Sequence, residues 1–322
     1  MKIKIRAEGN SDIGYGHLQR TYAIAEYILN HSDHEVSYYT KDSGAEFFIN
    51  KPVRHIEIEK EQEFVCAISS DEVVIVDGYE WDTSFLKNIK DKCYKLVIID
   101  DLDDKELTAD IIINHSPDST IDYSKSDVQE CLLGPKYALL SKPFINKYSD
   151  HSRVKDSILL CFGGSDPLNL TEKYWSIAAD CFSKVNLVTG PGYRYKNGLV
   201  NGLTKRSNVS HEHDVSSARM AEIMECCQYA LLPASGILFE ALSRGLIIYS
   251  GYFINNQRRI YDGFKREKLI IGLGDFEEIE PLYLKDQFNK REVSQKRIVS
   301  RDILKSIFDG NSMQRIYNEI MK

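Results

Sequence analysis

Short apolar runs rich in β-branched residues recur along the chain, separated by stretches long enough for amphipathic helices. They read IKIRA, EVSYYT, EVVIVDG, KLVIIDD and ADIIINH in the first half, then SILLCFGG, VNLVTG, YALLPA, LIIYSG and LIIGLG in the second. Strands that alternate with helices predict parallel sheets of the doubly wound type. Several runs are apolar at almost every position, as expected where helices cover both faces of a sheet. The pattern therefore predicts Rossmann-like α/β folds.

Two such folds fit the length of the chain. At 322 residues with 43% hydrophobic residues, the chain is long for one core and well supplied for two. A polar segment near residues 146–156 precedes the run SILLCFGG and is typical of a linker. We predict one Rossmann-like domain over residues 1–150 and another over residues 151–322. Their parallel sheets are expected to face a central cleft, because ligands of open α/β sheets bind at the carboxyl ends of the strands.

The last predicted helix could pack on either domain through its apolar residues Ile303, Leu304, Ile307 and Phe308. The prediction keeps it with the second domain.

Composition narrows the functional classes. The formal charge of −7 is spread without a long basic block, which disfavours nucleic acid as a partner. No run approaches the roughly 20 apolar residues of a membrane span, and the first residues, MKIKIRAEGN, lack the apolar core of a signal peptide. We therefore expect a cytoplasmic protein without stable membrane insertion. The oligomeric state is left open, with a monomer favoured.

The stretch SDIGYGHLQR, residues 11–20, lies between the first predicted strand and a helix. Gly14 and Gly16 would let a ligand approach the main chain, and the first helix amides could hold an anion. His17 stands at the helix N-terminus, where the helix dipole favours a neutral ring that can act as a base. An NAD site is disfavoured because the third small residue of that fingerprint is missing. A plain turn with an incidental histidine is the other interpretation.

Two loops of the second half have the character of phosphate sites. Gly164 and Ser165 follow a predicted strand, although a plain strand-to-helix turn fits them nearly as well. Ser235 and Gly236 open a helix whose free amides suit a diphosphate. Glu240 lies one turn further and could accept both hydroxyls of a ribose. It could also merely complement the helix dipole.

A third loop of the second half carries uncharged polar residues. Asn255, Asn256 and Gln257 follow the run LIIYSGY and offer the donors and acceptors that bind sugar hydroxyls. An ordinary helix N-cap at Asn255 or Asn256 is the alternative.

Two further clusters could bind metal. The aspartates of IIDDLDD, residues 98–104, could hold Mg²⁺ or Mn²⁺, but a solvated loop that caps the next element is favoured. His211 and His213 could share one face of a strand and bind zinc, yet no further ligand stands at a usual spacing.

Taken together, the motifs resemble a known enzyme family. GxGH with a following arginine, FGGSDP, and SG with a later glutamate and NQ are similar to UDP-2,4-diacetamido-2,4,6-trideoxy-β-L-altropyranose hydrolases of pseudaminic acid biosynthesis. These hydrolases are related to the GT-B glycosyltransferase that adds N-acetylglucosamine to the peptidoglycan lipid precursor. The resemblance extends to DDL at 100–102, ADIIIN at 109–114 and LLGPKYALL at 132–140.

The resemblance implies a GT-B fold that uses neither metal nor cofactor and binds a UDP-sugar as its partner. His17 matches the base that activates water. The other implied contacts are with UDP (Gly164, Ser165, Ser235, Gly236, Glu240) and with the sugar (Gly14, Gly16, Arg20, Tyr79, Asn255, Asn256, Gln257). The sequence ASGILFE and a longer segment after residue 275 depart from the family, which leaves the sugar's substituents open.

The expected reaction is hydrolysis of a UDP-linked 2,4-diacetamido-2,4,6-trideoxy sugar to free sugar and UDP. A GT-B glycosyltransferase of cell-surface polysaccharide synthesis is the main alternative, with an acceptor hydroxyl in place of water. Mixed charge over residues 31–60, with one FFI cluster, favours the hydrolase over an enzyme with a membrane acceptor. A protein that binds a sugar nucleotide without turnover is a further alternative.

Overall fold

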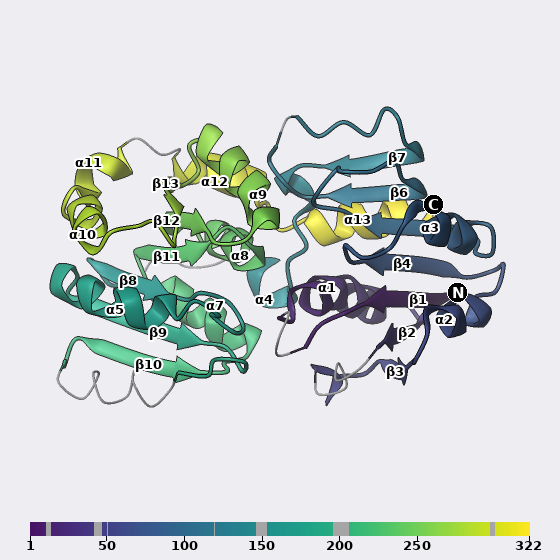
Figure 1. Ribbon diagram of the computed structural model, residues 1–322, viewed down its shortest axis with the longest axis horizontal. Coiled ribbons are helices and arrows are strands. Elements are labelled where there is room, and N and C mark those ends of the chain that lie inside the picture. Colours follow the sequence, from purple (N-terminus) through teal and green to yellow (C-terminus); the bar gives the residue numbers. More distant parts are fainter. Residues whose placement is uncertain are drawn as a thin grey trace. The chain divides into compact units, whose positions relative to one another are not determined.

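The computed structural model describes residues 1–10, 14–41, 47–49, 51–118, 120–145, 153–195, 206–296 and 300–322. The chain divides into two compact units, each built around one parallel β-sheet (Figure 1). The first unit comprises Met1–Lys142 and Asn311–Lys322, and the second comprises Pro143–Gly310.

The first unit holds a sheet in the order β3-β2-β1-β4-β5-β6-β7, with every neighbouring pair parallel. Its elements are β1 (Lys2–Ala7), α1 (Gly16–His31), β2 (Glu35–Thr40), β3 (Arg54–Glu57), α2 (Glu61–Ala67), β4 (Val73–Asp77), α3 (Thr83–Lys90), β5 (Lys95–Ile99), β6 (Thr108–Asn114), β7 (Asp127–Leu133), the 3-10 helix η2 (Pro135–Tyr137) and α13 (Ser312–Met321).

The second unit holds a sheet in the order β10-β9-β8-β11-β12-β13, again parallel throughout. Helix α4 (Lys142–Ile145) spans the division between the units. The other elements are β8 (Ser157–Leu160), α5 (Leu170–Cys181), β9 (Lys184–Thr189), β10 (Val209–His213), α7 (Ser217–Cys226), β11 (Tyr229–Pro233), α8 (Gly236–Ser243), β12 (Ile247–Tyr252), α9 (Asn255–Arg266), β13 (Ile271–Asp275), α10 (Pro281–Asn289), α11 (Arg291–Gln295) and α12 (Arg301–Ile307).

In both sheets the order in which strands are added reverses at the first strand of the unit. In the first unit β2 and β3 lie on one side of β1, while β4 to β7 lie on the other. In the second unit β8 has the same place, with β9 and β10 on one side and β11 to β13 on the other. Loops at such a switch point leave in opposite directions and open a crevice at the carboxyl ends of the strands. The switch points β1/β4 and β8/β11 are therefore the places where each unit can hold a ligand.

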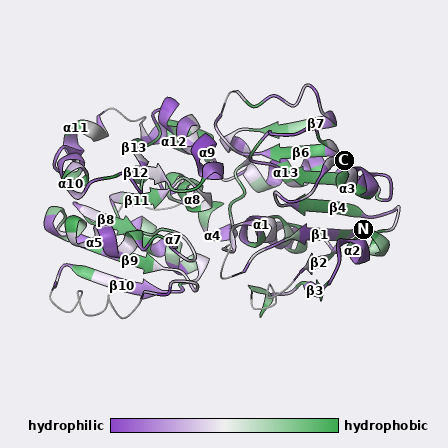
Figure 2. Cartoon of the chain, in the orientation of Figure 1, coloured by the Kyte–Doolittle hydropathy of each residue, from purple (hydrophilic) through white to green (hydrophobic). Residues whose placement is uncertain are grey.

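The predicted pair of Rossmann-like folds is confirmed. All ten apolar runs form strands, and the central ones are buried on both faces, as the five buried residues of β4 illustrate. The hydropathy colouring of β4 and β6 in Figure 2 shows the same concentration of apolar residues. Strands β3, β7 and β10 are not among the predicted runs. They are sheet edges whose residues are mostly exposed or half-buried, so they carry no apolar run that the sequence could reveal.

The last helix corrects the predicted domain assignment. Residues 151–322 were assigned to the second domain, but Asn311–Lys322 belongs to the first unit. Helix α13 packs on α1 through a buried apolar face formed by Met313, Ile316 and Ile320. The helical period of the sequence shows which face of this helix is apolar, but it does not show which element packs against that face. The division between the units falls at residues 142/143, and residues 146–152 of the predicted linker lie outside the described residues.

Helix α12 stays with the second unit. Of the four apolar residues considered for packing at the end of the chain, Leu304 is buried there, while Ile303 is 47% exposed. Among the described residues, none of the helices has both the length and the apolar content that a membrane crossing requires.

We predict that Ile316→Ala destabilises the first unit, although Ile316 lies far in sequence from residues 1–142, which form the rest of that unit. Ile316 is fully buried, so its truncation should remove about 2–5 kcal/mol from the free energy of unfolding. Hydrogen exchange of the β1 and β4 amides in urea measures this and separates the first unit from the second. The exposed Asn318→Ala on the same helix is the control. Unchanged exchange in Ile316→Ala would show that α13 adds nothing to the first unit.

Candidate active site

The loop between β1 and α1 brings open main chain to the first switch point. Gly14 has φ +85°, a left-handed conformation that favours glycine, and its N–H donates to the carbonyl of Asn10 at 2.8 Å. Gly16 begins α1. A Cβ added at either glycine would meet no atom within 4 Å, so space is open beside the main chain. Residues 11–13 of the motif lie outside the described residues.

His17 is held by a buried carboxylate from the neighbouring strand. Its Nδ1 lies 2.8 Å from Oδ1 of Asp77, the last residue of β4, whose side chain is fully buried. An ionised carboxylate only accepts hydrogen bonds, so Nδ1 carries the proton in this pair. The neutral ring then keeps its lone pair on Nε2. His17 is thereby set in the tautomer of a base, with the side chain 19% exposed.

Arg20 joins two buried aspartates. Its Nε and Nη2 each lie 2.6 Å from an oxygen of Asp77, and its Nη1 lies 2.6 Å from Oδ2 of Asp101, just after β5. One turn of α1 separates Arg20 from His17, so both side chains can reach Asp77. Arg20 was predicted to bind substrate. In the structure its guanidinium is taken up by the two carboxylates, and a contact with substrate stays a prediction.

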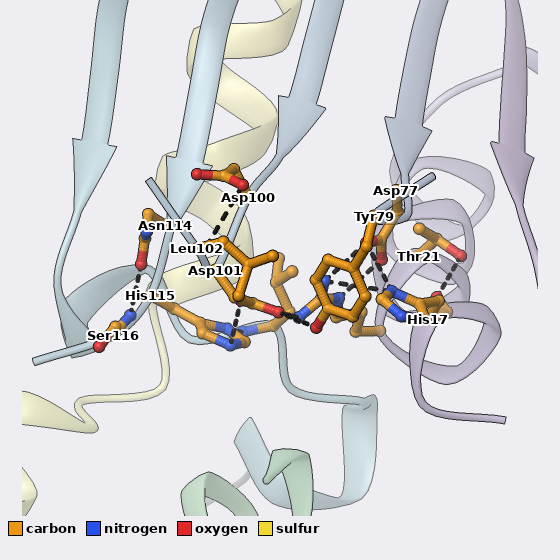
Figure 3. A network of polar contacts seen from close by, with 12 residues as sticks. His17, Thr21, Asp77, Tyr79, Asp100, Asp101, Leu102, Asn114, His115 and Ser116 are labelled. Atoms are coloured by element: carbon orange, nitrogen blue, oxygen red, sulfur yellow. Dashed lines mark hydrogen bonds and ion pairs between the residues drawn. The ribbon is translucent and has the colours of Figure 1, made fainter. Parts of the chain in front are cut away.

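Tyr79 and His115 complete the cluster (Figure 3). The Tyr79 hydroxyl donates to Oδ2 of Asp101 at 2.9 Å, and its ring meets that of His17 edge-on, with the centroids 4.8 Å apart. His115 follows β6, is 4% exposed, and places Nε2 3.8 Å from Oδ1 of Asp101. The cluster thus gathers the ends of four adjacent strands, β1, β4, β5 and β6.

Electrostatics keep the two aspartates ionised. Burial alone would raise the pKa of Asp101, but the charge of Arg20 outweighs it and holds that pKa well below its usual range. Burial likewise opposes ionisation of Asp77, and Arg20 with His17 lowers its pKa. Burial lowers the pKa of His115 to about 4, although Asp101 acts in the other direction, so His115 is neutral near pH 7. Arg20 is therefore the principal cation facing both aspartates.

The loop of residues 98–104 is not the solvated loop that was favoured, because Asp100 and Asp101 are buried, although Asp100 does cap the turn that follows it. Asp100 accepts from the backbone N–H of Asp103 at 2.8 Å and from the buried Tyr123 hydroxyl at 2.6 Å. Asp101 accepts from Arg20 and Tyr79. Both of these donors bind Oδ2 of Asp101, whereas its buried Oδ1 accepts no hydrogen bond from the described residues and lies 3.8 Å from Nε2 of His115.

The other metal candidates are also engaged by protein groups. His211 and His213 on β10 both contact the Thr189 hydroxyl, at 2.8 and 3.1 Å. In the part of the chain that the structure describes, the carboxylates close enough to share an ion are Glu8, Glu61 and Glu80. Arg6 forms ion pairs with Glu8 and Glu61, and Lys41 forms an ion pair with Glu61.

The first predicted phosphate loop lies at the switch point of the second unit. Gly163 has φ +88° directly beyond β8, and the Gly164 carbonyl accepts from the N–H of Gly192 at 2.9 Å. The Asp166 carboxylate accepts from two N–H groups at the start of α5, including that of Leu170 at 2.8 Å. Ser165 lies between these anchors and is half-buried.

The second predicted phosphate loop follows β11. Gly236 begins α8 and is exposed, and Ser235 precedes it with extended backbone. A Cβ added at Gly164 or Gly236 would meet nothing within 4 Å, so both loops leave room beside the main chain. Glu240 is half-buried in α8, and burial raises the pKa of its carboxyl to about 8, with Arg244 opposing the rise.

The third loop follows β12. Asn255, Asn256 and Gln257 form the first turn of α9, with Asn255 exposed and Gln257 buried. The N-cap position belongs to Ile254, so the N-cap interpretation of the two asparagines is wrong. The Gln257 side-chain oxygen accepts from the N–H of Phe253 at 3.1 Å. Because β8, β11 and β12 are adjacent and parallel, all three loops open at one edge of the sheet.

Sequence reasoning missed Asp77, Asp101 and His115 as members of the site. Each ends or directly follows an apolar strand, and all three lie within runs that the sequence analysis quotes, EVVIVDG, KLVIIDD and ADIIINH. The available signal was the strand order. Placing β4, β5 and β6 beside β1 brings all three side chains to the same edge as His17.

Comparisons with known proteins come from sequence relatives and from solved structures. No protein-family model matches the chain. An uncharacterised protein of Methanocaldococcus jannaschii is 29% identical over 291 residues, which cover 83% of this chain and 59% of the relative. The UDP-2,4-diacetamido-2,4,6-trideoxy-β-L-altropyranose hydrolase of Campylobacter jejuni is 27% identical over 182 residues, covering 53% of this chain and 63% of the relative. The chain thus spans about three fifths of the length of these curated relatives.

Among solved structures, MurG of Acinetobacter baumannii superposes with a TM-score of 0.66 over 99% of both chains at 11% identity. The calicheamicin glycosyltransferase CalG4 superposes with a TM-score of 0.65 over 99% of this chain and 97% of its own, also at 11% identity. The chain has the GT-B fold. At such low identity the likeness carries no further than the fold.

We predict that Arg20→Gln destabilises the first unit because it leaves two buried carboxylates without their cation. The loss should be about 3–5 kcal/mol at pH 7, measured by urea unfolding. Its pH dependence gives a second test. In the wild type the lowered pKa values of Asp77 and Asp101 confer stability that is lost only as pH falls below the ordinary value of 3.8. Without Arg20, burial raises both pKa values, so the deficit should shrink from pH 7 to pH 5.

The control for Arg20 is Arg219→Gln. Arg219 pairs with Glu212 and Glu222 at the exposed surface, so its loss should change stability little at either pH. An Arg20 deficit that stays constant between pH 7 and pH 5 would contradict the proposed charge balance.

Proposed function

We propose that the protein is a GT-B glycosyltransferase that transfers a sugar from a nucleotide sugar, with UDP as the nucleotide, and that His17 is its catalytic base. The observation that carries the proposal is the His17–Asp77 pair at the first switch point, 2.8 Å between Nδ1 and Oδ1. A buried carboxylate that fixes the tautomer of a partly exposed histidine is the arrangement by which histidine removes a proton from a hydroxyl.

The charges of the cluster suit that role. Asp77 and Asp101 contribute two negative charges and Arg20 one positive charge, so the cluster around a neutral His17 carries a net −1. When Nε2 takes the proton of the attacking hydroxyl, the imidazolium brings the cluster to neutrality. The positive ring thus forms beside the ionised carboxylate of Asp77, which accepts the hydrogen bond from its Nδ1–H.

Loops of the second unit are proposed to hold the nucleotide. Leaving-group departure places negative charge on the diphosphate, and the open helix start at Ser235 and Gly236 offers amides to that charge. Gly164 and Ser165 line the neighbouring strand end and are assigned to the same diphosphate. Glu240, one turn along α8, is assigned to the ribose.

The sugar is assigned to residues of the loops after β1 and β4 and to residues of the loop after β12. Tyr79 stands edge-on to His17, and Gly14 and Gly16 leave open main chain next to it. Asn255, Asn256 and Gln257 are assigned to sugar or diphosphate.

Fold analogy supports transfer over hydrolysis, because the solved structures of this architecture include the glycosyltransferase CalG4. Hydrolysis is the second candidate, favoured by the 27% identity to the Campylobacter jejuni hydrolase over about half the chain. In both reactions the same base acts on a hydroxyl, of an acceptor in one and of water in the other.

One experiment separates the two. A panel of UDP-sugars, including the 2,4-diacetamido-2,4,6-trideoxy sugar, is incubated with the protein, with and without glycan acceptors, and UDP release is measured. Release only with an acceptor supports the transferase, and equal release in water alone supports the hydrolase. A parallel arm with EDTA tests the expectation, carried by the family resemblance, that no metal is needed. UDP binding without any release would overturn both.

We predict that His17→Ala abolishes turnover while UDP affinity, measured by calorimetry, stays within about twofold of wild type, because base and nucleotide are assigned to different units. Asp77→Asn should lower kcat by a factor on the order of 10²–10⁴, because an amide no longer fixes the Nδ1–H tautomer. His31→Ala, at the other end of α1, is the matched control and should leave kcat unchanged. A parallel loss of UDP binding in His17→Ala would make the loop a nucleotide site.

We predict that UDP affinity rises between pH 7 and pH 9. The raised pKa of Glu240, about 8, means that its carboxyl ionises over this range, and only the carboxylate accepts from both ribose hydroxyls. Glu240→Gln should remove the rise and weaken binding at pH 9 by roughly tenfold. The exposed Glu222→Gln is the control. If Glu240→Gln and the wild type bind UDP equally well at pH 9, Glu240 does not bind the ribose and merely complements the helix dipole.

A further inference from the structure

Asp101 connects two parts of the site that are otherwise separate. It follows β5, and its side chain is 2% exposed. Its Oδ2 accepts from Nη1 of Arg20 at 2.6 Å and from the hydroxyl of Tyr79 at 2.9 Å. Arg20 in turn holds Asp77, which holds His17. A single buried oxygen therefore fixes both the tyrosine beside the base and the cation behind it.

The bond from Tyr79 sets what its hydroxyl can do. A phenol has one proton, and here that proton goes to Asp101, so toward any other group the oxygen can act only as an acceptor. The side chain is 36% exposed and has its ring edge against His17. Without the bond the hydroxyl could turn its proton outward. Asp101 thus makes Tyr79 an acceptor on the side of the base.

Asp101 also influences the charge at His17 through Arg20. The charged and titratable groups that face the ring are Asp77 from β4, Arg20 from α1 and Tyr79 from the loop after β4, with Asp101 behind Arg20. With Asp101 ionised, the cluster is net −1 and a proton on His17 neutralises it. Without that charge the cluster is neutral, and the same proton makes it +1. Loss of Asp101 should therefore disfavour the protonated ring.

We propose that Asp101 is a positioning residue for the reaction at His17. It aligns the Tyr79 oxygen to accept a hydroxyl of the sugar, and through Arg20 it favours the protonated His17 that forms when the base takes up a proton. The inference rests on the proposed function for its catalytic meaning, while its electrostatic part can be tested without any substrate.

The first test follows the titration of the His17 ring by NMR in the free protein, with histidine labelled and His17→Ala used for assignment. In Asp101→Asn, which keeps the shape and removes the charge, the midpoint should fall, because one negative charge fewer stabilises the protonated ring. Asp104→Asn, an exposed aspartate of the same loop, is the matched control and should leave the midpoint unchanged. An unchanged midpoint in a folded Asp101→Asn variant would overturn the inference whatever the enzyme does.

The second test uses turnover and keeps the inference falsifiable if Asp101→Asn fails to fold. Tyr79→Phe removes the bond to Asp101 together with the oxygen that is proposed to accept from the sugar, so kcat should fall about 10–100-fold while the KM for the nucleotide sugar changes little. In the double variant, Tyr79→Phe should not lower kcat below the value of Asp101→Asn alone, because Asp101 acts through Tyr79. An unchanged kcat in Tyr79→Phe alone, or additive losses of kcat in the double variant, would overturn the positioning role.

The two tests also separate this inference from the proposed function. A wild type that releases no nucleotide from any sugar, with a shifted midpoint in Asp101→Asn, would contradict the proposed reaction and support the electrostatic link. Normal turnover in wild type and in Asp101→Asn alike would support the reaction and overturn the inference.

Discussion

Two buried carboxylates can coexist at the first switch point only because Arg20 lies between them. Its three contacts of 2.6 Å to Asp77 and Asp101 place one cation against two anions that burial would otherwise force to take up protons. Every other member of the cluster takes its state from that pairing. His17 finds an ionised acceptor for Nδ1–H, and Tyr79 finds one for its hydroxyl. Removing the guanidinium would leave neither carboxylate reliably charged.

Topology explains how residues so far apart in sequence share this constraint. The strand order places β4 and β5 next to β1, and parallel strands end at one edge of the sheet. Asp77 closes β4 and Asp101 comes just after β5, while Arg20 lies one turn into the helix that follows β1. The 81 positions between Arg20 and Asp101 therefore collapse to one contact. The second unit repeats the same order and offers its loops at the corresponding edge.

The sequence predicts the scaffold well because buried parallel strands are apolar on both faces, and all ten such runs form strands. It fails where burial is one-sided or absent, as at the edge strands β3 and β7, and where an amphipathic helix must choose a partner, as at α13. Within the site, His17 stands out from a local motif, Arg20 and Tyr79 come from the family resemblance, and the structure brings the three together. Asp101 could be noticed only as a loop aspartate, since its value comes from a partner 81 positions away.

The charge of the cluster decides which chemistry this edge suits. A site built to bind an anion would present net positive charge, yet here the only guanidinium in the described cluster is consumed by two carboxylates and the balance is −1. Such a balance disfavours a phosphate next to His17 and favours a proton on its ring. The diphosphate must then be held elsewhere, and the open, uncharged helix starts of the second unit are where it is assigned. The charge balance therefore supports the proposed assignment of base and leaving group to different units, independently of any resemblance.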